Sequence, residues 1–378
     1  MKSSKIIAIK PLGKMPTMDI EVNSKDHIFY ANGIATSNSH GISYGLNSYL
    51  SAMCKAKNPV KFYEVYLDHA KRKQDTQAEI KQLVYDARVH NIEVYPPRIG
   101  NFYRNFTSID NNIYFGISLI KNVGVECDKI IAAFNGVNRD ISWIEILAKC
   151  SKGIKQNAFE ALILSGCLDG PTRPSRNQMF YEYDLWKNNL TDREIEFIAQ
   201  NIESTESLSH HINVLINNFK LSKPRLDKII NLKKVLDSPT VSFEDYPSWL
   251  AEKEEIYFGV ALTCSASDAA EDDSINANCK EIYQKTIRGK CGVAVTINSV
   301  REFAIKKEGK NKGKKMAFLC VADNTAMLDS IVVFPEAYEK YKRILYEGNT
   351  VVLQGSVDGD NGGLVVDNVC QIYERFML

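Results

Sequence analysis

Residues 19–41 read DIEVNSKDHIFYANGIATSNSHG, and the pattern of side chains changes between Asn38 and Ser39. Before that peptide bond, short apolar runs flank Asn32-Gly33, a dipeptide that favours a two-residue turn between paired strands. After it, apolar side chains recur at helical spacing. Their positions are Tyr44, Leu46, Tyr49, Leu50 and Met53. We therefore expect a short β-rich segment over 1–38, followed by a helix that buries this apolar face.

The part before the bond resembles the C-terminal fragment of a split intein. The resemblance rests on Asp19-Ile20-Glu21-Val22, on His27 through Ile34, and on Asn38 followed by Ser39. It departs from the commonest pattern at Ser37, where a histidine is frequent, and residues 1–38 hold no counterpart of the intein's first nucleophile. The resemblance implies splicing together with a partner chain that carries the intein N-fragment.

The side chains at this bond suit such a reaction. The Asn38 amide can attack its own main-chain carbonyl through a five-membered ring, which cuts the bond to Ser39. The Ser39 hydroxyl can accept an acyl group and then pass it to its own freed amine, a form of covalent catalysis. Because serine is a weak nucleophile, we expect Asp19 or His27 to assist by moving protons. These steps need no cofactor.

Two other interpretations of residues 1–38 stay open. The segment can be an ordinary docking hairpin, in which case the whole chain is a non-enzymatic, DNA-binding accessory subunit. It can also be a degenerate intein that only cleaves on its C-terminal side, given Ser37. Dispersed lysines and the lack of a long apolar core make it unlike a secretory signal.

Composition sets the broad class of the protein. The chain has 378 residues, of which 44% are hydrophobic and 25% charged, and its net charge is +1. We expect a soluble, multi-domain protein without a membrane span, whose nucleic-acid contacts come from local basic patches. Nine cysteines show no C-x-x-C spacing. They are predicted to be free thiols, neither disulfides nor metal ligands.

From Ser39 through Lys55 and Pro59-Val60, the sequence resembles the fingers of the bacterial replicative DNA polymerase III alpha subunit. This likeness begins where the intein-like part stops, as excision of an intein requires. It implies that 39–95 is a fingers element in which His40 and Lys55 approach the incoming nucleotide or template phosphates. Packing or solvation is the alternative for both side chains.

Ala70 to His90 predicts a surface helix with a solvated charged face, and short strands are expected between Ile92 and Gly116. Gly116 to Phe134 then resembles a helix-hairpin-helix within a DNA-binding region at 96–170. There, Gly124 is expected to allow a close backbone turn, with Lys121, Asn122 and the N–H groups of the next helix binding a DNA phosphate. A plain turn between core helices is the alternative.

Residues 171–285 are expected to be a helical connection and linker, with a flexible spacer over Ser265–Asn278. Members of the family often carry a sliding-clamp peptide near here. Gln178-Met179-Phe180 fits that pattern poorly, so a sliding clamp is left open as a partner. Leu250–Thr263 is similar to the helix that precedes the family's OB domain.

The final segment, 286–378, predicts an OB barrel of five strands with a helix after the third. Its strands are expected at Gly292–Val300, Met316–Val321, Leu328–Phe334, Thr350–Gly355 and Leu364–Tyr373, and its helix at Tyr338–Tyr346. The loop between the first two strands is expected to attract single-stranded DNA. Its lysines are Lys306, Lys307, Lys310, Lys312, Lys314 and Lys315. A merely solvated loop is the alternative, and Phe303 and Phe318 beside it are either stacking groups or core positions.

The family's acidic palm motif is the carboxylate cluster with which a polymerase holds Mg²⁺, and it has no counterpart after Ser39 in this sequence. We therefore expect no polymerase activity from this chain alone. The resemblance implies that a partner chain supplies the Mg²⁺-binding palm, and that the joined product binds template-primer DNA. The expected fold is multi-domain α+β: a β-rich leading segment, a mainly α-helical fingers and helix-hairpin-helix region, and a C-terminal β-barrel.

Overall fold

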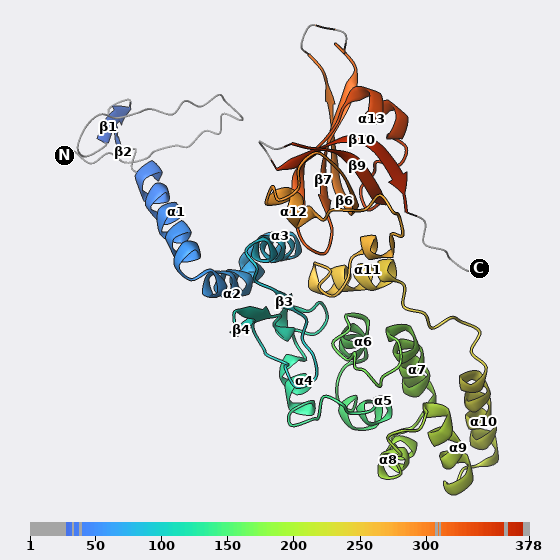
Figure 1. Ribbon diagram of the computed structural model, residues 1–378. Coiled ribbons are helices and arrows are strands. Elements are labelled where there is room, and N and C mark those ends of the chain that lie inside the picture. The colour runs from blue at the N-terminus through green and yellow to red at the C-terminus, as the bar shows by residue number, and fades with distance from the viewer. Residues whose placement is uncertain are drawn as a thin grey trace. The chain divides into compact units, whose positions relative to one another are not determined.

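The computed structural model describes residues 28–31, 34–37, 40–306, 309, 311–358 and 362–372 (Figure 1). The chain divides into two compact units, Met1–Pro59 and Val60–Leu378, and each is described by itself. No helix among the described residues is long and apolar enough to cross a membrane. All nine cysteines are free thiols, as predicted.

The first unit contains a hairpin and a helix. β1 (Ile28–Ala31) pairs antiparallel with β2 (Ile34–Ser37), and α1 (His40–Lys57) follows. The pairing agrees equally well with the intein resemblance and with an ordinary hairpin. The prediction that the apolar face of α1 is buried is wrong for this unit, since Tyr49 is 66% exposed and Leu46 is 56% exposed. Helical spacing gathers apolar side chains on one face, but it does not supply the surface that covers them.

The second unit begins with α2 (Pro59–His69), the 3₁₀ turn η1 (Ala70–Arg72) and α3 (Thr76–Val89). The prediction of a single surface helix over Ala70–His90 is therefore wrong, because a 3₁₀ turn and a separate helix occupy this range. Asp75 caps α3, because its side chain accepts a hydrogen bond from the Ala78 N–H at 3.0 Å. One face of α3 packs into the core, and Ile80 and Val84 on this face are fully buried.

Short elements make up the next part. A small sheet has the order β3 (Val94–Tyr95), β5 (Asn112–Tyr114), β4 (Thr107–Ile109), in line with the expected short strands. The helical elements that follow are η2 (Ile117–Leu119), α4 (Cys127–Ala133), α5 (Trp143–Glu145), the π-helical turn η3 (Ile146–Cys150) and α6 (Gln156–Leu164). Their apolar side chains share one core with α2 and α3.

The expected helical connection is a packed set of helices that belongs to the same core. They are α7 (Arg176–Asn189), α8 (Asp192–Gln200), α9 (Leu208–Asn218), α10 (Lys223–Asp237) and α11 (Pro247–Phe258). Trp186 and Leu215 are buried in this core. Met179 is also fully buried, which removes it from any surface that a clamp could reach.

The prediction of a flexible spacer over Ser265–Asn278 is also wrong. This segment contains η4 (Ala266–Ala269), which Ser265 caps. Farther along, the Asn276 side-chain oxygen accepts a hydrogen bond from the Gly292 N–H at 3.0 Å and so attaches the segment to the barrel. Polar side chains make these contacts, which is why a low apolar content did not predict them.

The C-terminal part is a closed five-stranded barrel (Figure 1). After α12 (Cys279–Tyr283) its elements are β6 (Lys290–Ala304), β7 (Lys315–Ala322), β8 (Met327–Val333), α13 (Pro335–Tyr341), β9 (Thr350–Asp358) and β10 (Gly363–Gln371). The order around the barrel is β10-β8-β7-β6-β9, with β10 parallel to β8 and antiparallel to β9. Five strands with a helix after the third confirm the expected barrel, and with it the mixed α+β class.

Candidate nucleic-acid interface

The segment expected to be a helix-hairpin-helix folds as a tight hairpin between η2 and α4. Its first arm is a single 3₁₀ turn rather than an α-helix. Asn122 occupies the left-handed region with φ 71°, a conformation that asparagine tolerates better than most residues. A Cβ on Gly124 would lie 2.9 Å from the Ser118 carbonyl oxygen. The glycine is therefore needed for close backbone approach, as predicted.

The tip of this hairpin is open to solvent. Lys121, Asn122 and Gly124 are exposed, and Val125 is 87% exposed. Within the described part of the chain, the main-chain N–H groups of Gly124 and Val125 make no hydrogen bond, and the Lys121 ammonium has no ion-pair partner. Successive free N–H groups beside a lysine form a concave donor set that suits a phosphate oxygen.

The helix that follows contributes less to phosphate binding than the sequence predicts. α4 has only seven residues, and Glu126 and Asp128 place carboxylates at its start. These negative charges offset the positive end of so short a helix. Phosphate binding at the N-terminus of this helix stays a prediction, and the turn before the helix is the better donor set.

A second hairpin, which the sequence reasoning missed, lies against the first. It joins η3 to α6 and contains Gly153, whose φ is 81°. Glu126, only 3% exposed, contacts Lys129 at 2.9 Å and Lys155 of the second hairpin at 3.1 Å. Hydrogen bonds from Lys129 and Lys155 hold the pKa of Glu126 below its usual range. The available sequence signal was a glycine between two apolar helical runs.

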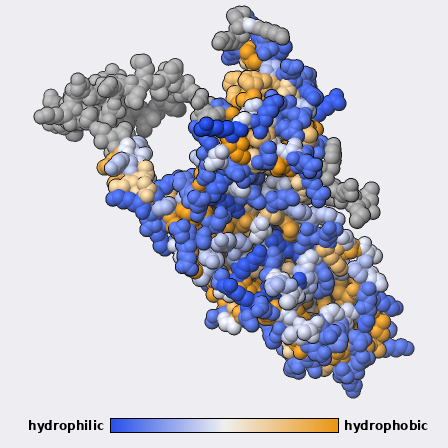
Figure 2. All heavy atoms as spheres, in the orientation of Figure 1, coloured by the Kyte–Doolittle hydropathy of each residue, from blue (hydrophilic) through white to orange (hydrophobic). Residues whose placement is uncertain are grey.

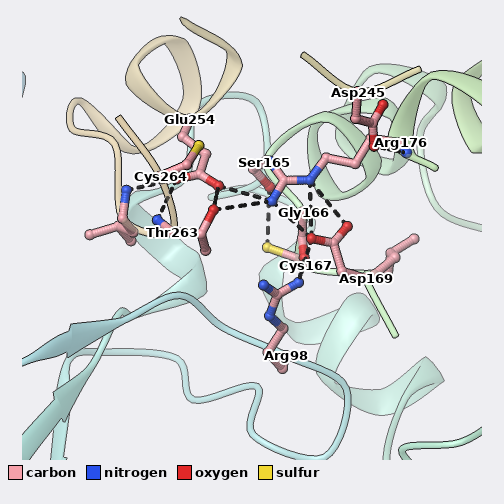
Figure 3. Close-up of polar contacts among 12 residues, drawn as sticks. Arg98, Ser165, Gly166, Cys167, Asp169, Arg176, Asp245, Glu254, Thr263 and Cys264 are labelled. Atoms are coloured by element: carbon pink, nitrogen blue, oxygen red, sulfur yellow. Dashed lines mark hydrogen bonds and ion pairs between the residues drawn. The ribbon is translucent and has the colours of Figure 1, made fainter. Parts of the chain in front are cut away.

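A buried ion network fixes the chain where it leaves α6 (Figure 3). Arg176, in the first turn of α7 and 3% exposed, donates to Asp169 at 2.8 Å and to Glu254 at 2.9 Å. Arg98 pairs with Asp169 at 2.8 Å and donates to the Gly166 carbonyl oxygen. Figure 3 shows these side chains converging from separate elements of the second unit.

The network keeps its central arginine charged. Burial acts to lower the pKa of Arg176, but hydrogen bonds and charge from Asp169 and Glu254 outweigh it and raise the pKa. Glu254, fully buried on α11, also accepts from the N–H groups of Leu262 at 2.7 Å and Thr263 at 2.8 Å. The network therefore ties the segment that carries Arg98, the segment that follows α6, α7 and α11 into one frame.

The lysine-rich loop joins β6 to β7, as predicted. Of its lysines, Lys306, Lys312, Lys314 and Lys315 are described, and all four are exposed. Lys315 pairs with Glu302 at 2.6 Å, so part of the positive charge is offset. The Ile305 N–H donates to the Lys314 carbonyl oxygen at 3.0 Å and closes the base of the loop.

Aromatic side chains accompany this loop on the outside of the barrel. Phe303 and Phe318 make an edge-to-face pair with ring centroids 5.9 Å apart, and Phe303 is 58% exposed. Ala317 and Leu319, which alternate with Phe318, are the buried positions. The interpretation of both phenylalanines as core positions is therefore wrong. Figure 2 shows hydrophobic patches among hydrophilic residues on the barrel surface.

The remaining predicted site residues keep their status as predictions. His40 begins α1 and Lys55 lies in its last turn, both in the first unit. The residues that lie outside the described part of the chain are Asp19, His27, Asn38, Ser39, Lys307 and Lys310. Among the described residues, no group of three or more His, Cys, Asp or Glu side chains is placed to hold a metal ion.

Comparisons with known proteins agree with this arrangement. A family model described as a helix-hairpin-helix motif matches residues 91–179, which include both hairpins. The DNA polymerase III subunit alpha of Aquifex aeolicus (strain VF5) is 27% identical over 327 residues, 85% of this chain and 24% of the relative. The subunit alpha of Borreliella burgdorferi is 25% identical over 351 residues, 90% of this chain and 28% of the relative.

The subunit alpha of Deinococcus radiodurans is 24% identical over 337 residues, covering 86% of this chain and 23% of the relative. The chain thus spans about a quarter of the length of the curated relatives it matches. It is homologous to part of the DNA polymerase III subunit alpha, and it combines a helix-hairpin-helix region with a five-stranded barrel.

Proposed function

We propose that this chain supplies DNA binding to a replicative DNA polymerase of the III alpha kind. The observation that carries the proposal is the exposed hairpin tip. There, the N–H groups of Gly124 and Val125 and the ammonium group of Lys121 have no partner among the described residues. Such a site holds a backbone phosphate without reading bases. The exposed lysines and Phe303 on the barrel support a second contact, with single-stranded DNA of the template-primer.

Lys121→Gln is expected to weaken binding of duplex DNA and to reduce the slope of log affinity against log salt by about 0.9, because one phosphate contact is lost. The measurement is a titration of labelled duplex at several salt concentrations. Lys342→Gln is the matched control, since Lys342 is paired with Glu339 at 2.6 Å on the barrel. Equal slopes for the Lys121 variant and the unaltered chain would contradict the hairpin assignment.

The finer proposal is that residues 1–38 are a split-intein fragment. On this view a partner chain carries the intein N-fragment and the Mg²⁺-binding palm, and splicing joins it to Ser39 to form one polymerase in a bacterial or phage-infected cell. The residues from Asp19 to Asn38 support it.

Mixing the chain with its partner is expected to release a fragment ending at Asn38 and to form a longer ligated product. Asn38→Ala removes the cyclising amide and is expected to block release, whereas Ser39→Ala removes the acyl acceptor and is expected to block ligation. Mass spectrometry of the products provides the measurement. If the chain stays at 42.7 kDa with its partner, the alternative of a non-catalytic DNA-binding accessory subunit replaces splicing. Release of the fragment without ligation identifies residues 1–38 as a degenerate intein that only cleaves on its C-terminal side.

A further inference from the structure

The backbone of the hairpin tip is attached to helix α11, which lies far from it in the sequence. The Lys121 main-chain N–H donates to the Tyr257 carbonyl oxygen at 3.0 Å. The last four carbonyl groups of an α-helix have no partner within the helix, and they carry its partial negative charge. At the end of α11, one of these carbonyl groups therefore accepts its hydrogen bond from the hairpin that carries the proposed phosphate site.

The end of α11 is itself held in one conformation. Gly259 ends the helix with φ 86°, and its N–H donates to the Glu255 carbonyl oxygen at 2.9 Å. The Phe258 side chain is 1% exposed, and its ring centroid lies 4.8 Å from that of Phe115. The Tyr257 carbonyl oxygen thus belongs to a packed part of the fold, although the hairpin tip that it contacts is open to solvent.

This attachment decides which N–H groups of the tip are available to a ligand. The Lys121 N–H is used by α11, and Asn122 follows it with φ 71°. A fixed amide followed by a fixed left-handed residue sets the direction in which the chain continues. It therefore also sets the orientation of the N–H groups of Gly124 and Val125, which have no partner among the described residues.

We propose that the end of α11 positions the hairpin tip for binding, with the Tyr257 carbonyl group and Gly259 as positioning groups that act through the Lys121 backbone. The inference rests on the proposed function of the hairpin, and it places a determinant of that function on a helix outside both hairpins. Because a main-chain N–H carries no net charge, turning the tip away is expected to lower affinity without changing the number of phosphates that lysines neutralise.

Gly259→Ala in the full chain is the test variant. Its added Cβ would lie 3.0 Å from the Cβ of Gln77 on α3, and a positive φ is unfavourable for alanine, so the end of α11 is expected to shift. Duplex affinity is expected to fall about tenfold, as for the loss of one hydrogen bond to a charged group. The slope of log affinity against log salt is expected to stay unchanged, and hydrogen exchange at the Lys121 amide is expected to become faster.

Gly289→Ala is the matched control, because Gly289 has φ 84° and no atom lies within 4 Å of the position that its Cβ would take. It is expected to change neither duplex affinity nor exchange at Lys121. Adding Gln77→Gly to the Gly259 variant removes two of the three atoms nearest to the new Cβ and is expected to restore part of the affinity. A general loss of stability would not be corrected in this way, because glycine itself destabilises a helix.

The outcomes separate this inference from the proposed function. Faster exchange at Lys121 with unchanged duplex affinity would overturn the positioning role and leave the hairpin assignment standing. Unchanged exchange at Lys121 would also overturn it, because α11 would then not hold the tip. A reduced salt slope in the Gly259 variant would show the loss of an ionic contact and contradict a role in orientation alone. An unaltered chain without duplex affinity overturns the proposed function itself, and this inference with it.

Discussion

Arg176→Met is expected to lower the free energy of unfolding by about 3–5 kcal/mol, because it removes the only cation that contacts the buried Glu254 within the described part of the chain. Glu254 is fully buried, and among the described residues Asp169 would keep only Arg98 as an ion-pair partner. Removing one partner of a buried ion pair leaves the other charge unpaired in a region of low dielectric. This destabilises the fold more than replacing both charged residues by apolar ones would. The loss is therefore expected to exceed that of any exposed ion pair in the chain.

Urea unfolding, followed by the fluorescence of the buried Trp143 and Trp186, provides the measurement. Arg176→Met combined with Glu254→Gln removes both charges and is expected to recover part of the loss. Arg104→Met is the surface control, since Arg104 and Asp128 are 54% and 79% exposed and exposed pairs contribute little. If the double variant is no more stable than the Arg176 variant, the uncompensated charge is not the cause.

Gly166→Ala is expected to destabilise the same region by about as much as the loss of Arg176, and by more than backbone strain alone, which costs roughly 1–3 kcal/mol. Gly166 has φ 78°, and a Cβ there would lie 2.1 Å from a guanidinium nitrogen of Arg176. The buried arginine would have to move, and its contacts with both carboxylates would be disturbed.

Gly153→Ala is the matched control for this substitution. Gly153 has nearly the same backbone conformation, with φ 81°, but no atom lies within 4 Å of the position that its Cβ would take. The Gly153→Ala variant therefore shows the backbone strain of a positive φ without a steric clash at the added Cβ. Equal unfolding midpoints for the two variants would contradict the assigned role of the Arg176 contact.

Local patterns predicted the barrel well. Alternation along Val293, Val295 and Ile297, all fully buried, indicates a strand with one face inside. The observed strands begin and end within a few residues of the expected ones, except that β6 continues to Ala304. A strand's end depends on its partner: Phe303 and Ala304 are in β6 because they pair with Met316 and Lys315 of β7. That pairing is not a property of either segment alone.

The candidate site was predicted in part. Lys121, Asn122 and Gly124 were identified because Gly116 to Phe134 resembles a helix-hairpin-helix. The turn is observed, and the phosphate contact of these residues stays a prediction. The second hairpin was missed because only its contact with Glu126, through Lys155, makes it part of the same surface. The residues of that contact are separated in sequence and show no spacing pattern.

By itself, the sequence determined the mixed α+β class, the positions of the barrel strands along the chain and the turn at Gly124, because periodicity and backbone restrictions act over a few neighbouring residues. Only the tertiary structure decided which charges are buried and which are left in solvent. Arg176 and Glu254 meet although they are 78 residues apart, whereas Lys223 and Lys234 meet no carboxylate in the described residues. Electrostatic partners are set by distance in space, and that distance exists only after the core has packed.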